Sequence, residues 1–141
     1  MNDSTLFRIV YDSVCVLPGG HASELQLQDI LEVARRFNLE SRITGALRCD
    51  RVYFLQVLEG PRGPVVSTMA RIQRDGRHTR VNIIEAAPLA RRDFADWSMA
   101  LVPDHSATMA RLTNPDLLDF RPATGAQAAN ALRAMLASHR A

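Results

Sequence analysis

The stretch VYFLQVL, residues 52–58, is apolar on both faces of the strand that it predicts. Successive strand residues point to opposite faces, so Gln56 shares one face with Phe54 and Leu58, and the other face is apolar as well. We therefore expect this strand to lie in the centre of a sheet, with the amide of Gln56 buried. A buried amide without hydrogen-bond partners costs about 1–3 kcal/mol, so its oxygen and its nitrogen both need partners, from the protein or from a ligand.

Strand and helix patterns alternate on both sides of this stretch. The polar pair Asp50–Arg51 indicates a hairpin into residues 52–58. Further strands are predicted at residues 6–11, 43–49, 81–85 and 94–101, and helices from about residue 23 to 37 and from about residue 65 to 75. This order is close to the split βαβ pattern with one added strand. We therefore predict an α+β fold, a ferredoxin-like βαββαββ sheet with two helices on one face.

The chain after this pattern is short and helical in character. A final amphipathic helix is predicted, with one apolar side made of Ala126, Ala129, Leu132, Met135 and Leu136. Such a stripe has to be covered, so we expect it to pack on the free face of the sheet or on a second copy of the chain. The sequence thus divides into a domain at residues 1–102 and a C-terminal helical extension at residues 103–141.

Composition excludes several classes of function. All 17 basic residues are arginine and none is lysine, which excludes a Schiff-base lysine and a P-loop lysine. The arginines are scattered among 15 acidic residues without a basic run, so no nucleic-acid binding is expected. The first residues have neither a basic segment nor an apolar one, and no long apolar run follows, so we expect no signal peptide, no membrane span and a cytoplasmic protein.

No arrangement typical of an enzyme or a metal site is present. Cys15 and Cys49 lie far apart and are expected to be reduced thiols. The four histidines are dispersed, with no metal-binding spacing, so we predict no metal site. Ser13 and Ser98 have no matched histidine and acidic partners. The sequence therefore indicates that the chain is not an enzyme.

Other polar side chains are expected near Gln56. Tyr11 ends the apolar face of the first strand, and the first and third strands of this fold are neighbours, so its phenol can reach Gln56. Asn38 follows the first helix, and Arg71 and Asp75 are four residues apart on the second. Each has a purely structural interpretation: a core glutamine bonded to a hydroxyl, a helix-terminal asparagine, and a surface ion pair worth about 0.3–0.5 kcal/mol.

Apolar residues complete the arrangement. Ile30 and Ile72 are expected to form the walls of a cleft between the two helices, which suits a flat apolar ring with polar edges, such as a flavin. Trp97 and Met99 alternate onto one face of the last strand together with Leu101, where core packing is the alternative interpretation.

Five groups of residues, in chain order over about residues 6–102, resemble the motifs of BLUF domains, the blue-light sensors that use FAD. They are LFRIVY at 6–11 with Ser13, ITG at 43–45, FLQVLEG at 54–60, DGRH at 75–78, and RDF at 92–94 with WSM at 97–99.

This resemblance implies a binding site for FAD, held without a covalent bond. The flavin ring would lie between the two helices, with Ile30 and Ile72 on its faces, Asn38 at its C4 carbonyl and N3, and Arg71 near O2. The remaining cofactor-binding residues that the resemblance implies are Asp75, His78, Tyr11, Gln56, Trp97 and Met99. Phe37 stands where many members have a polar residue, so one contact to the flavin is expected to be missing.

The resemblance also implies a mechanism. Light makes the flavin a strong oxidant, Tyr11 gives an electron and then a proton through Gln56, and the amide of Gln56 is left rearranged, with a red shift of the absorption. Trp97 and Met99 pass the change to the fifth strand and the C-terminal helices. The implied protein is a photoreceptor that acts on a downstream effector protein and forms a homo-oligomer.

Two other functions fit the same sequence. The first is a ferredoxin-like regulatory or interaction module without flavin photochemistry, in which Gln56 and Tyr11 bond only to each other. The second is a small hydrolase of similar topology, which would need an arginine and an asparagine beside a glycine-rich loop; Pro18–Gly19–Gly20 has no such pair beside it.

Overall fold

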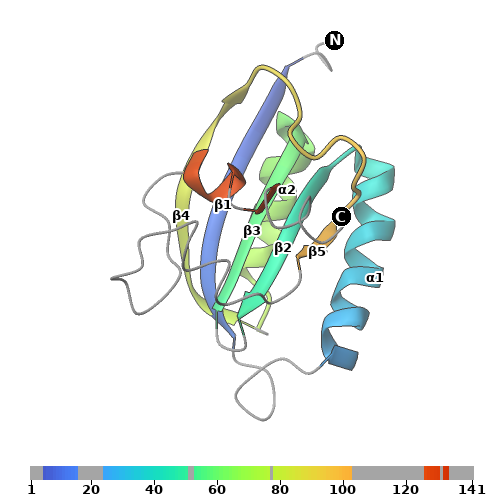
Figure 1. Ribbon diagram of the computed structural model, residues 1–141, viewed down its shortest axis with the longest axis vertical. Coiled ribbons are helices and arrows are strands. Elements are labelled where there is room, and N and C mark those ends of the chain that lie inside the picture. Colours follow the sequence, from blue (N-terminus) through green and yellow to red (C-terminus); the bar gives the residue numbers. More distant parts are fainter. Residues whose placement is uncertain are drawn as a thin grey trace.

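The computed structural model describes residues 5–15, 24–50, 53–76, 78–102, 126–130 and 132–133. Strands and helices follow the predicted βαββαββ order, which confirms the α+β, ferredoxin-like fold (Figure 1). The elements are β1 (Leu6–Cys15), α1 (Glu24–Ser41), β2 (Thr44–Asp50), β3 (Tyr53–Pro61), α2 (Arg62–Gln73), β4 (His78–Leu89) and β5 (Ala100–Val102).

The sheet has five strands in the order β4-β1-β3-β2-β5, so the strand that carries Gln56 is central, as predicted. β3 pairs antiparallel with β1 on one side and with β2 on the other, while β5 pairs parallel with β2. The register places Tyr11 of β1 and Leu47 of β2 directly opposite Gln56. The predicted neighbourhood of Tyr11 and Gln56 is therefore confirmed.

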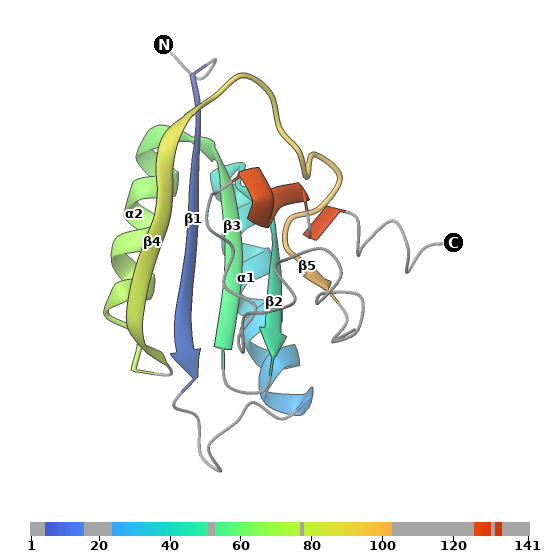
Figure 2. The same cartoon turned by 60° about the vertical axis from the view of Figure 1, so that its left-hand side comes forward.

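Both faces of the sheet are covered. α1 and α2 lie on one face, and the described C-terminal residues lie on the other (Figures 1 and 2). We call the core on the first face the helix-side cluster; it contains Phe7, Ile9, Tyr11, Leu31, Ile43, Leu47, Phe54, Leu58, Val65, Met69 and Met99. We call the core on the second face the far-side cluster; it contains Val10, Ala46, Leu55, Val57, Phe94, Ala100, Ala128, Ala129 and Leu132.

The predicted C-terminal helix covers the free face of the sheet. Ala129 and Leu132 are buried in the far-side cluster, as expected, but Ala126 is exposed and Ala128 is buried in its place. The buried side of this helix is thus centred differently from the predicted stripe, because Ala128 packs on the sheet. Met135 and Leu136 lie outside the described residues.

Three predicted boundaries were wrong, and each affects the site. α1 continues to Ser41, so Asn38 lies inside the helix. α2 ends at Gln73, where a tightened last turn bonds the Asp75 N–H to the Ile72 carbonyl at 3.0 Å, so Asp75 follows the helix. β5 is three residues long, and Trp97 and Met99 precede it in an irregular segment.

Candidate functional site

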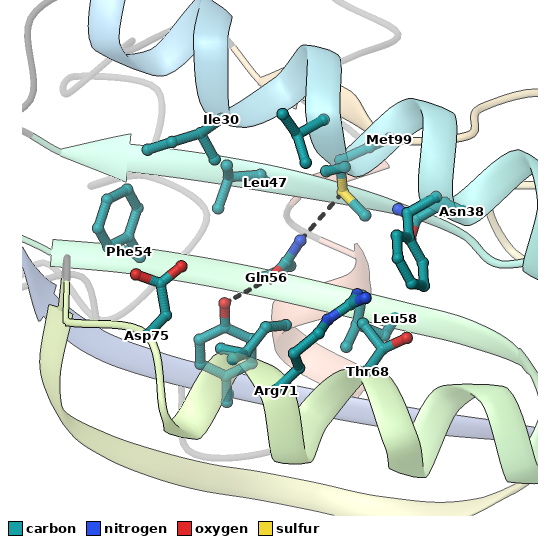
Figure 3. Close-up of a pocket in the computed structure, with 15 residues that line it drawn as sticks. Ile30, Asn38, Leu47, Phe54, Gln56, Leu58, Thr68, Arg71, Asp75 and Met99 are labelled. Carbon is teal, nitrogen blue, oxygen red and sulfur yellow. Dashed lines mark hydrogen bonds between the residues drawn. The ribbon is translucent and has the colours of Figure 1, made fainter.

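A cleft of about 310 Å³ lies between α1, α2 and the sheet. Its lining is mostly apolar, with a few polar side chains that point inward (Figure 3). The lining residues are Tyr11, Ile30, Val33, Ala34, Phe37, Asn38, Leu47, Phe54, Gln56, Leu58, Thr68, Arg71, Ile72, Asp75 and Met99. The size and the mixture of walls and polar groups suit a small-molecule site.

The amide of Gln56 lies at the floor of the cleft and has a protein partner on each side. The hydroxyl of Tyr11 donates a hydrogen bond to Oε1 of Gln56, and Nε2 of Gln56 donates to Sδ of Met99 at 3.2 Å (Figure 3). Tyr11, Gln56 and Met99 are exposed by only 3%, 6% and 2%. The expectation that Gln56 is buried and bonded to Tyr11 is confirmed. The second partner of the amide, the Met99 sulfur, comes from the irregular segment before β5 and not from a strand of the sheet.

α1 holds the segment that carries Met99. Nδ2 of Asn38 donates to the carbonyl oxygen of Ser98 at 3.0 Å, and Nε of Arg35 donates to the carbonyl oxygen of Met99 at 2.9 Å. Asn38 is buried and lines the cleft. Its position inside the helix therefore serves two purposes, since it fixes the chain before β5 and presents an amide to the cleft. The sequence did not indicate the contact of Arg35.

A cation lies above an aromatic ring where α1 and α2 face each other across the cleft. The guanidinium carbon of Arg71 lies 3.6 Å from the centroid of the Phe37 ring, a distance typical of a cation–π interaction. Both side chains belong to the lining, one from each helix. Phe37 is therefore part of the cleft, although it cannot supply a polar contact.

The other predicted site residues have three different outcomes in the structure. Ile30, Ile72 and Asp75 line the cleft, as expected. Trp97 does not belong to the lining and packs against the far-side cluster, so the prediction that it shares one strand face with Met99 was wrong. The cause is a turn in which the Trp97 N–H bonds to the Phe94 carbonyl at 3.0 Å. The backbone of His78 begins β4, and its side chain lies outside the described part of the structure.

Two further polar residues were missed. Thr68 of α2 is buried and lines the cleft. Glu59 of β3 is 0% exposed, on the sheet face opposite the cleft. A glutamate directly after an apolar strand pattern was the available signal for Glu59, because a carboxylate buried there needs hydrogen-bond donors. Nothing in the local sequence marks Thr68.

The cleft fits a flat ring with polar edges. An isoleucine from each helix contributes to its walls, and amide, guanidinium and carboxylate groups lie at its edges. Within the described ranges, no three histidine, cysteine, aspartate or glutamate side chains gather as they would around a metal ion. None of the described helices has both the length and the apolar character that a membrane crossing requires.

Comparison with known families gives a match over most of the chain. Residues 6–100 match the sequence pattern of the family described as BLUF, sensors of blue-light using FAD. The beta subunit of the photoactivated adenylate cyclase of Euglena gracilis is 38% identical over 119 residues, which cover 83% of this chain. The aligned region is 13% of that cyclase subunit, so the chain spans a small part of its relative.

Solved structures show the same fold. The dark-state structure of BlrB, a BLUF protein, has a TM-score of 0.76 and 29% identity, covering 97% of this chain and 98% of that one. The photo-activated state of BlsA has a TM-score of 0.79 and 28% identity, covering 93% of this chain and 94% of that one. A bacterial light-regulated adenylyl cyclase has a TM-score of 0.67 and 27% identity over 96% of this chain and 35% of that one.

The length of the family match, the identity to the Euglena subunit and the shared fold agree with the cleft and with its buried Tyr11–Gln56 pair. This chain belongs to the BLUF family, the flavin-binding sensors of blue light.

Proposed function

We propose that this chain is a photoreceptor that binds FAD without a covalent bond in the cleft between α1 and α2 and reports blue light through the amide of Gln56. The observation that carries the proposal is the buried chain of hydrogen bonds from Tyr11 through Gln56 to Met99 at the floor of that cleft. The chain itself acts as a sensor domain and not as an enzyme. A cytoplasmic location is part of the proposal.

The proposed binding residues act from the two helices and the sheet. Ile30 and Ile72 would hold the flavin ring between the helices, and Asn38 and Arg71 would bond to its polar edges. When bound, the flavin supplies a group that absorbs blue light and becomes a strong oxidant. Contacts to the flavin are also proposed for His78 and for Asp75 and Met99, which line the cleft, whereas Trp97 packs on the other face of the sheet.

The amide of Gln56 accepts one hydrogen bond and donates the other, so its two orientations differ in the bonds that they make. In the structure the phenol of Tyr11 donates to Oε1, and Nε2 donates to the sulfur of Met99. After half a turn of the amide, Oε1 would face a sulfur that has no hydrogen to donate. The amide would then have one hydrogen bond fewer within the protein, a cost of about 0.5–1.5 kcal/mol. The turned amide is therefore expected to revert in the dark.

We expect the rearrangement of the Gln56 amide to be transmitted to the rest of the chain through Met99. Met99 directly precedes β5, which pairs with β2 at the edge of the sheet. A rearranged Gln56 changes the partner of the sulfur and so displaces the chain that enters β5. We propose that this displacement reaches an effector protein through residues 103–141 of the chain, and that the protein acts as a homo-oligomer. The relatives that are light-regulated cyclases support an effector of the signalling class.

A second candidate function has one observation in its favour. Both polar groups of the Gln56 amide already have partners within the protein. A regulatory or interaction module with no functional photochemistry would keep the same bonds as a static part of its core.

Two measurements distinguish the candidates. The purified protein, supplied with FAD or with FMN in parallel titrations, is expected to bind FAD and to show a flavin absorption that shifts to the red after blue light. Gln56→Leu is expected to keep the flavin and to lose the shift. A wild-type protein that takes up no flavin supports the interaction module, and a full shift in Gln56→Leu refutes the role of the amide.

A further inference from the structure

The segment from Asp93 to Met99 joins the two faces of the sheet. Phe94 is buried in the far-side cluster, whereas Met99 is buried in the helix-side cluster. Between them the chain passes beside β2, where the N–H of Gly45 donates to the carbonyl oxygen of Trp97 at 3.1 Å. The position of the Met99 sulfur therefore depends on how this segment is held on both faces.

On the far face, one carboxylate holds the beginning of the segment. Oε1 of Glu59 accepts hydrogen bonds from the Phe94 N–H at 2.6 Å and from the Thr44 hydroxyl at 2.8 Å, and Oε2 accepts one from the Asp93 N–H at 2.8 Å. The guanidinium of Arg92 donates to Thr44 Oγ1 at 2.8 Å and to the Glu59 carbonyl at 3.3 Å. Both side-chain oxygens of Glu59 thus accept hydrogen bonds from the backbone of this segment, which holds its beginning on the far face.

On the cleft face, the end of the segment is held by α1. Arg35 and Asn38 donate to the carbonyl oxygens of Met99 and Ser98, and the Met99 sulfur lies 3.2 Å from Nε2 of Gln56. The two sets of bonds thus fix the segment at both ends. Asn38 of the α1 anchor lines the cleft, whereas Glu59 lies on the other face and outside the lining.

We propose that Glu59 is a positioning residue, which holds the segment before β5 so that the sulfur of Met99 remains where the Gln56 amide returns to it. This inference rests on the proposed photoreceptor function. If the segment loosens, the sulfur occupies the correct place for only a fraction of the time. The return of the Gln56 amide requires the sulfur in that place, so its rate falls in proportion to the fraction of time that the sulfur is there. Loosening at Glu59 should therefore slow dark recovery without changing the flavin contacts.

Glu59→Gln tests this with little change of shape. The glutamine keeps one acceptor oxygen but turns an NH₂ group toward a backbone N–H, so one anchoring bond is lost. With FAD bound, we expect an unchanged red shift, FAD affinity within about twofold of wild type, and dark recovery slower by up to about fivefold, the full effect of one hydrogen bond. Glu32→Gln is the control with the same chemical change, because Glu32 forms an exposed ion pair with Arg36 within α1 at 3.5 Å. It should recover at the wild-type rate.

A second set of variants, made in Met99→Leu, distinguishes positioning of the Met99 sulfur from a general loosening of the structure. In Met99→Leu the sulfur is gone, so Glu59→Gln should no longer slow recovery if it acts through that atom. An equal slowing with and without the sulfur would overturn the proposal.

Thr44 provides a milder pair of variants in case Glu59→Gln does not fold. Thr44→Val removes the hydroxyl that bonds Glu59 and should also slow recovery, and Thr44→Ser, which keeps the hydroxyl, should restore the wild-type rate. Wild-type recovery in Thr44→Val, or in a folded Glu59→Gln, refutes the role of Glu59 and leaves the photoreceptor function standing. If the wild-type protein shows no light-induced shift at all, the proposed function fails and this inference fails with it.

Discussion

Replacing Tyr11 by phenylalanine removes a single oxygen atom from the floor of the cleft. Tyr11 is 3% exposed and Gln56 is 6% exposed, and the two residues are directly opposite in the β1–β3 register. Without the phenol, Oε1 of Gln56 loses the donor that it has in the structure. A buried acceptor left unsatisfied costs about 1–3 kcal/mol, so the free energy of unfolding should fall by that amount.

A double-mutant cycle with Gln56→Leu isolates the bond from the burial of each side chain. Urea unfolding in the dark, followed by circular dichroism, should give a coupling energy of about 1 kcal/mol between Tyr11→Phe and Gln56→Leu. Ser13→Ala is a suitable control, since Ser13 is buried on the same strand but lies opposite Phe54. Its coupling to Gln56→Leu should be close to zero.

The same Tyr11 variant also tests the photochemistry. Tyr11→Phe should retain flavin, because the ring of residue 11 still contributes to the apolar floor, and should show no red shift after blue light. A coupling energy below about 0.3 kcal/mol would refute the direct bond, because independent sites are additive to about that accuracy. A full red shift in Tyr11→Phe would refute the proposed relay even if the bond is present.

Three further variants test other parts of the site. Gly45→Ala would place a Cβ atom 1.9 Å from the Val57 carbonyl oxygen, so the free energy of unfolding should fall by about 1–3 kcal/mol, measured by the urea midpoint. Arg71→Ala removes a cation from the cleft and should weaken FAD binding by about tenfold in a calorimetric titration, while the red shift remains; equal affinity would contradict the proposed contact. Trp97→Phe should leave FAD affinity within about twofold of wild type, because Trp97 packs outside the cleft, but should change dark recovery or the output to a partner. An unchanged photocycle together with unchanged partner binding would refute a role of Trp97 in signalling.

The elements with strong periodicity were predictable from the sequence. The stretch at residues 52–58 identified a central strand, and alternation put Gln56 on one face with Phe54 and Leu58, which line the cleft in the structure. The order of elements was enough to place β1 beside β3, because the ferredoxin-like topology brings those strands together. The Tyr11–Gln56 pair followed from that topology and needed no knowledge of a side-chain position.

Features that depend on long-range contacts were not predictable. α1 extends past residue 37 to Ser41, and within it Asn38 bonds to the distant Ser98, a contact that no local propensity contains. Trp97 and Met99 alternate in the sequence, yet a turn after Phe94 directs them to different faces of the sheet. The donors of Glu59 come from residues 15 to 35 positions away, so its role as an anchor became visible only in the folded chain.

The most direct test of this account is the absorption spectrum of the purified wild-type protein, loaded with FAD, recorded in darkness, after blue light and after return to darkness. The buried Gln56 amide, with a donor on one side and a sulfur acceptor on the other, leads us to expect a red shift of the flavin absorption that disappears in the dark. A protein that binds FAD in the cleft and keeps the same spectrum under blue light would contradict the proposed role of the Gln56 amide.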